Sequence, residues 1–354
     1  MTARQILLLS AYRADSHAAW ADWLQRSLTG FRWRTLELPG RHFRWRIRGN
    51  PLSWLDALAE EPAPDLILAT SMVDLSTIRG LHPHLAGVPA WYYFHENQFV
   101  HPVSDRQVKS VEPQIVQVYG ALCADRLLFN SAFNRDSFLE GVKRLLHRMP
   151  DHAPRGVADR LRDKCQLCPV PVTPIAPAPE RDERLILWSH RWEYDKQPEV
   201  FARAMVKLAD RGVAFRLALL GARHREPGEA LQLLRKRLGD RIVADGKLSG
   251  QAYHEVVGRA GIAVSTARHE LQGLAMLEAA SAGVRPLVPD HLCYPEQYSS
   301  CYRYPADDME ALVRRLEQWL DEGLPPAPDV SAWSGAGLRS RWEQLLAEGA
   351  GGKE

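Results

Sequence analysis

Two carboxylates eight residues apart are the first residues in this chain whose spacing suggests chemistry. Glu270 follows the short apolar run 261–264, typical of a buried parallel strand, and Glu278 lies in a run of helix formers that stops at Gly283. Ligands of open α/β sheets bind beyond the carboxyl ends of the strands. The helix start near Gly273 offers unpaired N–H groups and a positive dipole end. The stretch predicts a site for a phosphate-bearing ligand with hydroxyls; a solvated helix with a capping acid is the alternative.

Two cations follow another strand in the same half of the chain. Arg191 and Lys196 come after the strand pattern 184–188, so we expect them at the same sheet edge as Glu270. Two cations and a helix N-terminus would stabilise the charge on a departing diphosphate. The alternative is that Arg191 and Lys196 pair only with neighbouring acids such as Glu193 and Asp195.

Alternating strand and helix patterns position these residues. In the first half we predict a helix at 16–28 and strands at 6–9, 31–38, 65–70, 88–94 and 126–130. In the second half we predict strands at 184–188, 215–220, 241–244, 261–264 and 285–289, then a helix capped by Asp307 and a last helix near 338–347. This alternation indicates an α/β fold class with parallel, doubly wound sheets.

The chain divides at a run of prolines. Five prolines between 169 and 179 exclude a helix or a central strand there and predict a semi-rigid linker. We therefore expect Rossmann-like domains at 1–168 and 181–325, a linker at 169–180 and a C-terminal segment at 326–354. A ligand cleft between the two domains is the expected site.

Bulk composition excludes several function classes. The 354 residues exceed what a single core usually supports, and the net charge of +2, from 45 basic and 43 acidic residues, gives no global nucleic-acid signature. The N-terminal apolar run is too short for a signal peptide, and no run approaches transmembrane length. Five scattered cysteines fit a reducing cytoplasm, and the lone Cys165–Cys168 pair predicts no metal site. We expect a cytoplasmic protein without a membrane or obligate protein partner.

The four charged residues also resemble a known signature. Arg191, Lys196 and the E-x₇-E pair of Glu270 and Glu278 look like the donor site of family-four retaining glycosyltransferases of the GT-B fold. The resemblance implies two facing Rossmann-like domains, a nucleotide-sugar bound by the C-terminal one, and no metal or other cofactor. It implies that Arg191 and Lys196 hold the diphosphate, Glu270 the sugar hydroxyls and Glu278 the ribose. The other donor-binding residues expected at the helix start are Leu271, Gln272, Gly273 and Leu274.

His95 follows the strand 88–94, again at a carboxyl edge. The resemblance implies that it contacts the donor sugar, and that the last helix crosses back to the N-terminal domain. A hydrogen-bonded packing histidine is the alternative, although the adjoining polar run 96–98 favours a functional role. The turn after the first strand lacks the glycine pair common in this superfamily, but Ser16 and His17 there are placed to meet a polar ligand.

Longer stretches are similar to a narrower group. Residues 40–48, 93–98, 188–196 and 268–280 together resemble tRNA-queuosine α-mannosyltransferases. These enzymes transfer mannose from GDP-mannose to the cyclopentenediol of queuosine in tRNA-Asp. The resemblance therefore implies that 1–168 binds tRNA and that 181–325 binds the nucleotide-sugar. It makes the chain a retaining hexosyltransferase in which the leaving oxygen serves as the base.

Basic residues interleaved with aromatic ones support an RNA acceptor. Residues 41–48 hold four arginines with Phe43 and Trp45 among them, a composition suited to phosphate contacts and base stacking. The predicted acceptor residues are Ser16, His17, Arg41, Phe43, Arg44, Trp45, Arg46, Arg48, Glu96, Asn97 and Gln98. A second basic cluster comprises Lys143, Arg144, His147, Arg148, Arg155, Arg160, Arg162 and Lys164. A solvated basic face is the alternative for both clusters.

Two other functions stay open at this point. One is a glycosyltransferase that acts on an envelope glycan or a lipid carrier, which predicts an apolar-tipped membrane surface on the N-terminal domain. The other is a non-catalytic RNA or nucleotide-sugar binding protein. The complete set of Arg191, Lys196, Glu270 and Glu278 argues against a binding module, which does not need all four.

Overall fold

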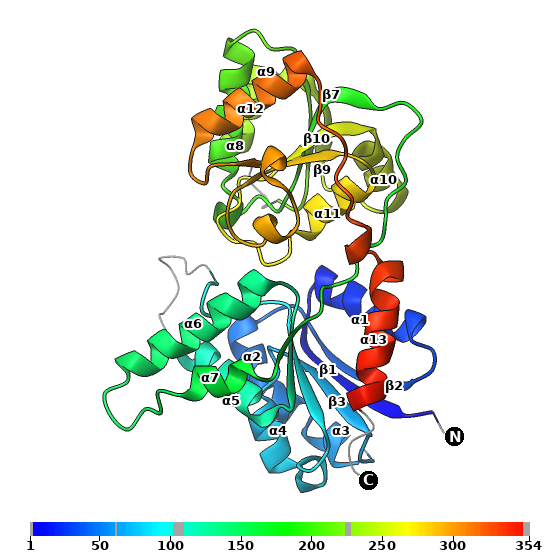
Figure 1. Ribbon diagram of the computed structural model, residues 1–354, viewed down its shortest axis with the longest axis vertical. Helices are drawn as coiled ribbons and strands as arrows, with labels where there is room; N and C mark the ends of the chain where they lie inside the picture. Colours follow the sequence, from blue (N-terminus) through cyan, green and yellow to red (C-terminus); the bar gives the residue numbers. More distant parts are fainter. Residues whose placement is uncertain (1–2, 61, 102–109, 224–227, 350–354) are drawn as a thin grey trace. The chain divides into compact units, whose positions relative to one another are not determined.

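The chain forms two compact units, which we describe separately. The computed structural model describes residues 3–60, 62–101, 110–223 and 228–349. The first unit comprises 1–171 together with 335–354, and the second comprises 172–334 (Figure 1). The first unit is thus built from two segments that flank the whole of the second in sequence.

The first unit contains a six-stranded parallel sheet in the order β2-β1-β3-β4-β5-β6. Its strands are β1 (Gln5–Arg13), β2 (Arg32–Pro39), β3 (Leu66–Thr70), β4 (Ala90–Phe94), β5 (Arg126–Phe129) and β6 (Cys165–Leu167). Its helices are α1 (Asp15–Ser27), α2 (Phe43–Ser53), α3 (Leu55–Ala59), α4 (Leu75–Leu81), α5 (Glu112–Cys123), α6 (Ala132–Arg148), α7 (Val157–Arg162) and α13 (Gly335–Gly349). Strands β3 and β4 are buried along their whole length, as central strands covered by helices must be.

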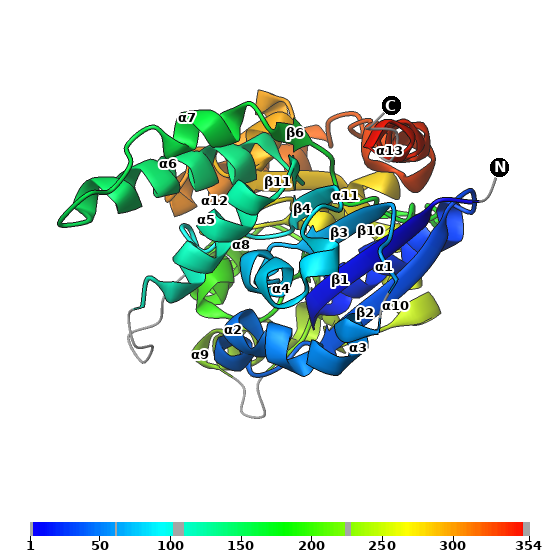
Figure 2. The same cartoon turned by 90° about the horizontal axis from the view of Figure 1, so that it is seen from below.

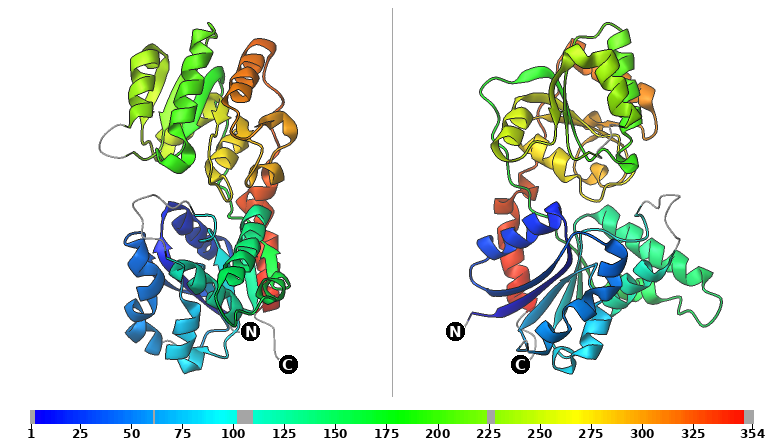
Figure 3. Two further views of the ribbon diagram at one scale, coloured as in Figure 1. Left: turned by 90° about the vertical axis from the view of Figure 1, so that its left-hand side faces the viewer. Right: turned by 180° about the vertical axis from the view of Figure 1, so that it is seen from behind.

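Helix α13 completes the core of this unit. Its Trp342 is fully buried, with ring centroids 6.0 Å from Trp20 and 5.8 Å from Tyr93. The Arg4 side chain also donates to the Ala347 carbonyl at 2.7 Å. Figure 2 and Figure 3 show this helix in red beside the blue α1 and β1. The last helix therefore packs on residues from the opposite end of the sequence.

The second unit repeats the architecture, with strand order β12-β11-β10-β7-β8-β9. Its strands are β7 (Asp182–Ser189), β8 (Arg216–Leu220), β9 (Ile242–Gly246), β10 (Ala260–Val264), β11 (Arg285–Pro289) and β12 (Arg303–Tyr304). Its helices are α8 (Pro198–Asp210), α9 (Glu229–Leu238), α10 (Gly250–Arg259), α11 (Leu274–Ser281) and α12 (Met309–Glu322). The first strand, β7, pairs with β10 in parallel, and the strand order reverses between them. Such a switch point is where doubly wound sheets bind ligands.

The predicted fold class is confirmed, two elements have bounds that the sequence patterns did not specify, and the predicted cap of one helix is wrong. Residues 43–53 form helix α2, and Cys165–Leu167 form the edge strand β6, which pairs with β5. The cap of α12 is Asp308, whose carboxylate accepts from the Ala311 amide at 2.9 Å, whereas Asp307 adopts a left-handed backbone conformation. Within the described ranges, no helix has the length and apolar character needed to cross a membrane.

Candidate active site

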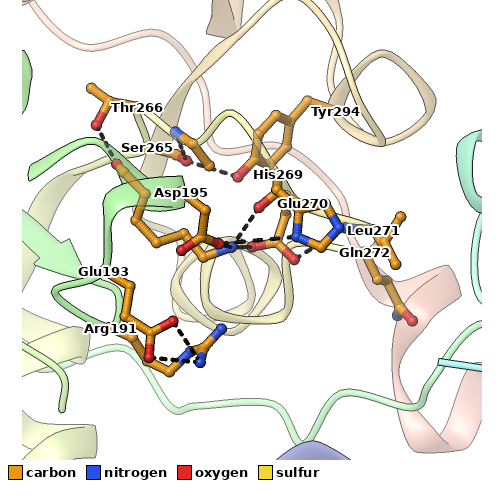
Figure 4. Close-up of polar contacts among 12 residues, drawn as sticks. Arg191, Glu193, Asp195, Ser265, Thr266, His269, Glu270, Leu271, Gln272 and Tyr294 are labelled. Carbon is orange, nitrogen blue, oxygen red and sulfur yellow. Dashed lines mark hydrogen bonds and ion pairs between the residues drawn. The ribbon is translucent and has the colours of Figure 1, made fainter. Parts of the chain in front are cut away.

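The switch point of the second unit brings Lys196 and Glu270 together. Lys196 follows β7 and Glu270 follows β10, and the two strands are neighbours in the sheet. The Lys196 ammonium donates to Glu270 Oε2 at 3.1 Å and to the His269 carbonyl at 2.5 Å, and lies 3.3 Å from Asp195 Oδ2 (Figure 4). An ammonium has three N–H donors. All three therefore have acceptors before any ligand arrives.

Both members of this pair are held in their charged forms. Burial raises the pKa of Glu270, but Lys196, His190 and the Gly273 amide outweigh it and lower the value to about 2. Burial lowers the pKa of Lys196, but Glu270 and Asp195 outweigh it, so the net shift is upward. The site is thus a buried ion pair with a second carboxylate against the same cation.

Backbone contacts between the two loops fix this geometry. The Arg268 amide donates to the Asp195 carbonyl at 2.8 Å, and the Thr266 hydroxyl donates to the Lys196 carbonyl at 2.8 Å. On the far side, Ser265 Oγ lies 2.8 Å from the Tyr294 hydroxyl. The loop after β10 is therefore tied to the loop after β7, which keeps Glu270 beside Lys196.

Arg191 occupies a different environment. Its side chain is 59% exposed and pairs with Glu193 at 2.9 Å (Figure 4), whereas the Lys196 side chain is 8% exposed. The pairing with Glu193, and that of Lys196 with Asp195, are the acid contacts that the sequence left open as the alternative. Arg191 would reach a ligand by leaving a solvent-screened pair, which costs little.

The start of α11 is organised around Glu270. The Leu271 amide donates to Glu270 Oε1 at 3.2 Å, and the Gly273 amide also bonds this carboxylate. Gly273 has φ +63°, and a Cβ there would lie 2.9 Å from the Tyr294 ring, so the position requires glycine. Leu271 and Gln272 are buried beside it, and Leu274 is half-buried. Two of the amides expected to face an anion are thus occupied by Glu270.

Glu278 lies inside α11, as the sequence predicts, and has a tyrosine partner. The Tyr253 hydroxyl donates to Glu278 Oε2 at 3.0 Å and lies 3.2 Å from Ser189 Oγ at the end of β7. Burial raises the pKa of Glu278, although the bond from Tyr253 opposes this. Tyr253 and Asp195 are site residues that sequence reasoning did not assign, since neither belongs to the four-residue signature.

His190 is a further residue that sequence reasoning left without a role. It is 6% exposed, and its Nε2 has no hydrogen-bond partner among the described residues. Burial, and then the Lys196 charge, lower the pKa of His190 to about 4. A buried imidazole nitrogen without a partner usually marks a place where a ligand or water completes the bonding. Its position directly after β7 is the signal that could have identified it.

The His190 pKa gives a prediction on stability. The unfolded chain takes up a proton near pH 6.5 and the folded chain near pH 4, so unfolding becomes easier as the pH falls between these values. The contribution is about 3 kcal/mol at pH 4 and vanishes above pH 6.5. We expect the free-energy difference between wild type and His190→Gln, measured by urea titration, to shift by this amount between pH 7 and 4. A free-energy difference that stays the same between pH 7 and 4 would contradict the low pKa of His190.

In the first unit, the structure brings His95 and His17 together. Their ring centroids lie 4.0 Å apart, at the ends of β4 and β1, and Trp20 packs edge-on against His95 at 4.7 Å. Burial lowers the pKa of both histidines, for His95 well below its ordinary value, so both are neutral at pH 7. His17 Nδ1 and His95 Nε2 have no partner within the described residues. The pair has the unmet bonding capacity of a ligand site.

The polar run 96–98 after His95 is half-buried at Glu96 and Gln98 and buried at Asn97. Glu96 is half-buried and raises the pKa of His17 against the larger effect of burial. Asn97 is fully buried, and its amide donates to Asn134 Oδ1 at 2.7 Å, which is a structural role. The Gln98 amide N–H bonds Gln117 at 2.8 Å, and Ser16 is half-buried in the first turn of α1.

The basic stretch 41–48 lies at and within the start of helix α2. Arg41, Arg44, Trp45 and Arg48 are exposed, and Phe43 and Arg46 are half-buried. Arg48 is not free, because its guanidinium pairs with Asp74 and with Glu112. Phe43 packs parallel to His101, with centroids 6.1 Å apart. The predicted stacking residues are thus only partly available, and Trp45 is the most exposed of them.

Both halves of the chain match known protein families. The profile described as "tRNA-queuosine alpha-mannosyltransferase N-terminal" matches residues 5–172, and "Glycosyl transferases group 1" matches 174–332. The tRNA-queuosine alpha-mannosyltransferase of Drosophila melanogaster is 32% identical over 324 residues, which covers 88% of this chain and 85% of that protein. The two matches meet where the first unit's opening segment ends.

Solved structures similar to this chain identify the fold. HepE of Anabaena in complex with UDP has a TM-score of 0.68 at 10% identity and covers 98% of this chain and 100% of its own. Sucrose-phosphate synthase of Thermosynechococcus elongatus has a TM-score of 0.67 at 15% identity, with 98% and 96% covered. The lipopolysaccharide outer core galactosyltransferase WaaB has a TM-score of 0.66 at 10% identity, with 97% and 99% covered.

Two parallel sheets with charged residues at a switch point, together with these matches, define a glycosyltransferase of the GT-B fold. The expected fold and class are confirmed. More narrowly, the chain belongs to the tRNA-queuosine α-mannosyltransferase family.

Proposed function

We propose that this protein transfers mannose from GDP-mannose to the cyclopentenediol of queuosine in tRNA-Asp, in the cytoplasm. Family membership supports the reaction type and the acceptor. The observation that carries the proposal is the buried contact between Lys196 and Glu270 at the switch point, with Arg191 on the loop after β7 and Glu278 in helix α11. A pure RNA-binding protein has no need of this charged site.

The proposed reaction is a substitution with retention that needs no metal. The bond between the mannose C1 and the β-phosphate oxygen breaks, and a queuosine hydroxyl forms the new C1–O bond on the same face. The hydroxyl proton passes to the departing phosphate oxygen, so the products are mannosyl-queuosine and GDP. Lys196 and Arg191 stabilise the negative charge that builds on the diphosphate. Glu270 orients the sugar, and His95 contacts it.

Lys196 must change partners for this to occur. Its three N–H groups bond the His269 carbonyl, Glu270 and Asp195, so a phosphate oxygen replaces one of the three. Release of Glu270 would free that carboxylate for a sugar hydroxyl at the same moment. Donor binding and alignment of the sugar are therefore one event in this proposal.

Incubation with defined tRNA tests the function directly. We expect queuosine-containing tRNA-Asp and GDP-mannose to yield a nucleoside heavier by one hexose, measured by mass spectrometry of the digested tRNA. The same tRNA with guanosine in place of queuosine is the control and should gain nothing. UDP-linked sugars in parallel reactions identify the donor. Absence of the hexose with every donor would refute the proposal.

A further inference from the structure

Helix α6 carries cations on a single exposed face. Lys143, Arg144, His147 and Arg148, which we call the α6 basic face, follow one another at intervals of one, three and one residues and are all exposed. This spacing places them on one side of a helix, over its last two turns. They line a shallow hollow together with one acid, Glu140. At pH 7 the face carries three permanent positive charges.

Within the described residues, the side chains of Lys143, Arg144 and Arg148 have no hydrogen-bond or ion-pair partner in the protein. No ion pair forms at Lys143, Arg144 or Arg148 in the described part of the chain, whereas Arg48 of helix α2 pairs with two acids. Basic residues late in a helix gain some stability from its dipole. That effect fades within the last turn, and it does not account for Lys143 and Arg144. The α6 basic face therefore has a net positive charge, which favours binding of an anionic partner.

The other side of α6 argues against insertion of this helix into a membrane. Phe138, Leu139, Val142 and Leu145 are buried in the core of the first unit. Helices that bind membranes insert an apolar face between the lipids. The exposed side of α6 has no apolar residue to insert, and a polyanion in solution is the better match.

Helix α6 also has a fixed relation to His95. The Asn130 side chain, just before the helix, donates to the His95 carbonyl at 2.9 Å, and Asn134 in its first turn donates to the Phe94 carbonyl at 3.0 Å. At 1.5 Å per residue, positions 143–148 lie about 18–25 Å along the axis from Ser131. One nucleic-acid strand advances about 3.4 Å per nucleotide, so this span equals about five to seven nucleotides.

We infer that the α6 basic face binds backbone phosphates of the tRNA anticodon stem while the queuosine base lies near His95. This inference rests on the proposed function. It adds a second region of contact with the tRNA, beyond the anticodon loop that carries queuosine. Phosphate contacts of this kind position an RNA without reading its sequence. Helix α7 packs against α6 and presents the exposed Arg160 and Arg162 nearby, which extends the positive surface (Figures 1 and 2).

Charge reversal on this face provides the test. We expect the triple variant Lys143→Glu, Arg144→Glu and Arg148→Glu to bind queuosine-containing tRNA-Asp about 10- to 100-fold more weakly in a filter or gel-shift assay. The slope of log affinity against log salt should shrink by about 2 to 3, roughly one per lost phosphate contact. The KM for the nucleotide-sugar should not change.

A matched triple variant controls for net charge. Arg26→Glu, Lys236→Glu and Arg259→Glu reverse three exposed cations that make no ion pair among the described residues and lie late in their own helices. This variant should keep tRNA affinity within about threefold of wild type. Thermal melting of both triples checks that each remains folded.

A short substrate locates the contact. A queuosine-containing anticodon loop without its stem lacks the phosphates in question, so the α6 triple and wild type should bind it equally. Equal tRNA affinity and an equal salt slope in the α6 triple and wild type would overturn the inference, even with transfer intact. A second result would overturn it in favour of a membrane. In that result, wild type binds vesicles of anionic lipid, and the α6 triple loses vesicle binding but keeps tRNA binding. Because tRNA binding is measured without turnover, a failure of hexose transfer would contradict the proposed function and leave the binding test of the α6 basic face as a separate result.

Discussion

Replacing Lys196 with Ala is expected to lower kcat/KM for the nucleotide-sugar by about 10²- to 10³-fold. This is the usual cost of removing one preorganised group from a developing negative charge. We expect this large effect because Lys196 is buried, where little water screens its charge, and because both loops of the switch point hold it in place. Steady-state kinetics with saturating tRNA give the measurement.

The same change also affects folding, and the two effects must be separated. Without Lys196, Glu270 and Asp195 lose their cation in a buried place, which costs about 3–5 kcal/mol when one partner of such a pair is removed. The pKa of Glu270 should then rise from about 2. Kinetics should therefore be recorded at a temperature where melting curves show the variant folded.

Lys207 provides the control for Lys196→Ala. It lies on α8, pairs with Glu310 and is 41% exposed in its side chain. Lys207→Ala should leave kcat/KM within about twofold, because an exposed pair contributes at most about 1 kcal/mol to stability and touches no ligand. If Lys196→Ala retained full kcat/KM while folded, the assignment of this residue to the diphosphate would be wrong.

Replacing Trp342 with Ala is expected to destabilise the first unit by about 3–5 kcal/mol, the range for buried tryptophan and phenylalanine. Trp342 is fully buried against Trp20 and Tyr93, and no other side chain of α13 is as large. For a unit of this size the melting temperature should fall by roughly 10 °C. Differential scanning calorimetry can follow the transition of the first unit apart from that of the second.

A surface aromatic residue gives the comparison. Tyr119 on α5 is 54% exposed, and Tyr119→Ala should change stability by less than about 1 kcal/mol. The effect of Trp342→Ala should extend to catalysis, because Trp20 and Tyr93 also pack against His95. Unchanged melting in Trp342→Ala would mean that α13 does not stabilise the first unit.

Much of the fold could be predicted from local patterns. Buried parallel strands are short apolar runs, and those near Ile6, Leu66, Leu185 and Ile262 are plain in the sequence. The positions of Glu270 and Glu278 relative to β10 and α11 follow from the same patterns. Helix α2 could not be predicted in this way, because its sequence has little amphipathic character and contains Pro51. The side of α2 that is buried depends on contacts distant in sequence, such as the hydrogen bond that the Asp74 amide donates to Asn50 Oδ1.

Less of the candidate site than of the fold could be predicted from the sequence. Residue types identified Lys196 and Glu270, but not that they bond each other or that Asp195 shares the cation. Such pairing depends on which strands are adjacent, a long-range property that no local pattern contains. The exposed state of Arg191 and the burial of Asn97 depend in the same way on neighbours distant in the chain. For the two basic clusters, the sequence showed only that both are positively charged, and the structure distinguished the paired Arg48 from the exposed cations of α6 that form no ion pair among the described residues.

The split composition of the first unit has a consequence for synthesis on the ribosome. Residues 335–349, which bring Trp342 to its place beside Trp20, are translated only after all of 172–334. The second unit can therefore reach its native state first, although domains nearer the N-terminus usually lead. Until α13 emerges, the nascent first unit exposes the aromatic surface that this helix later covers, and during that interval it is open to chaperones and to premature aggregation.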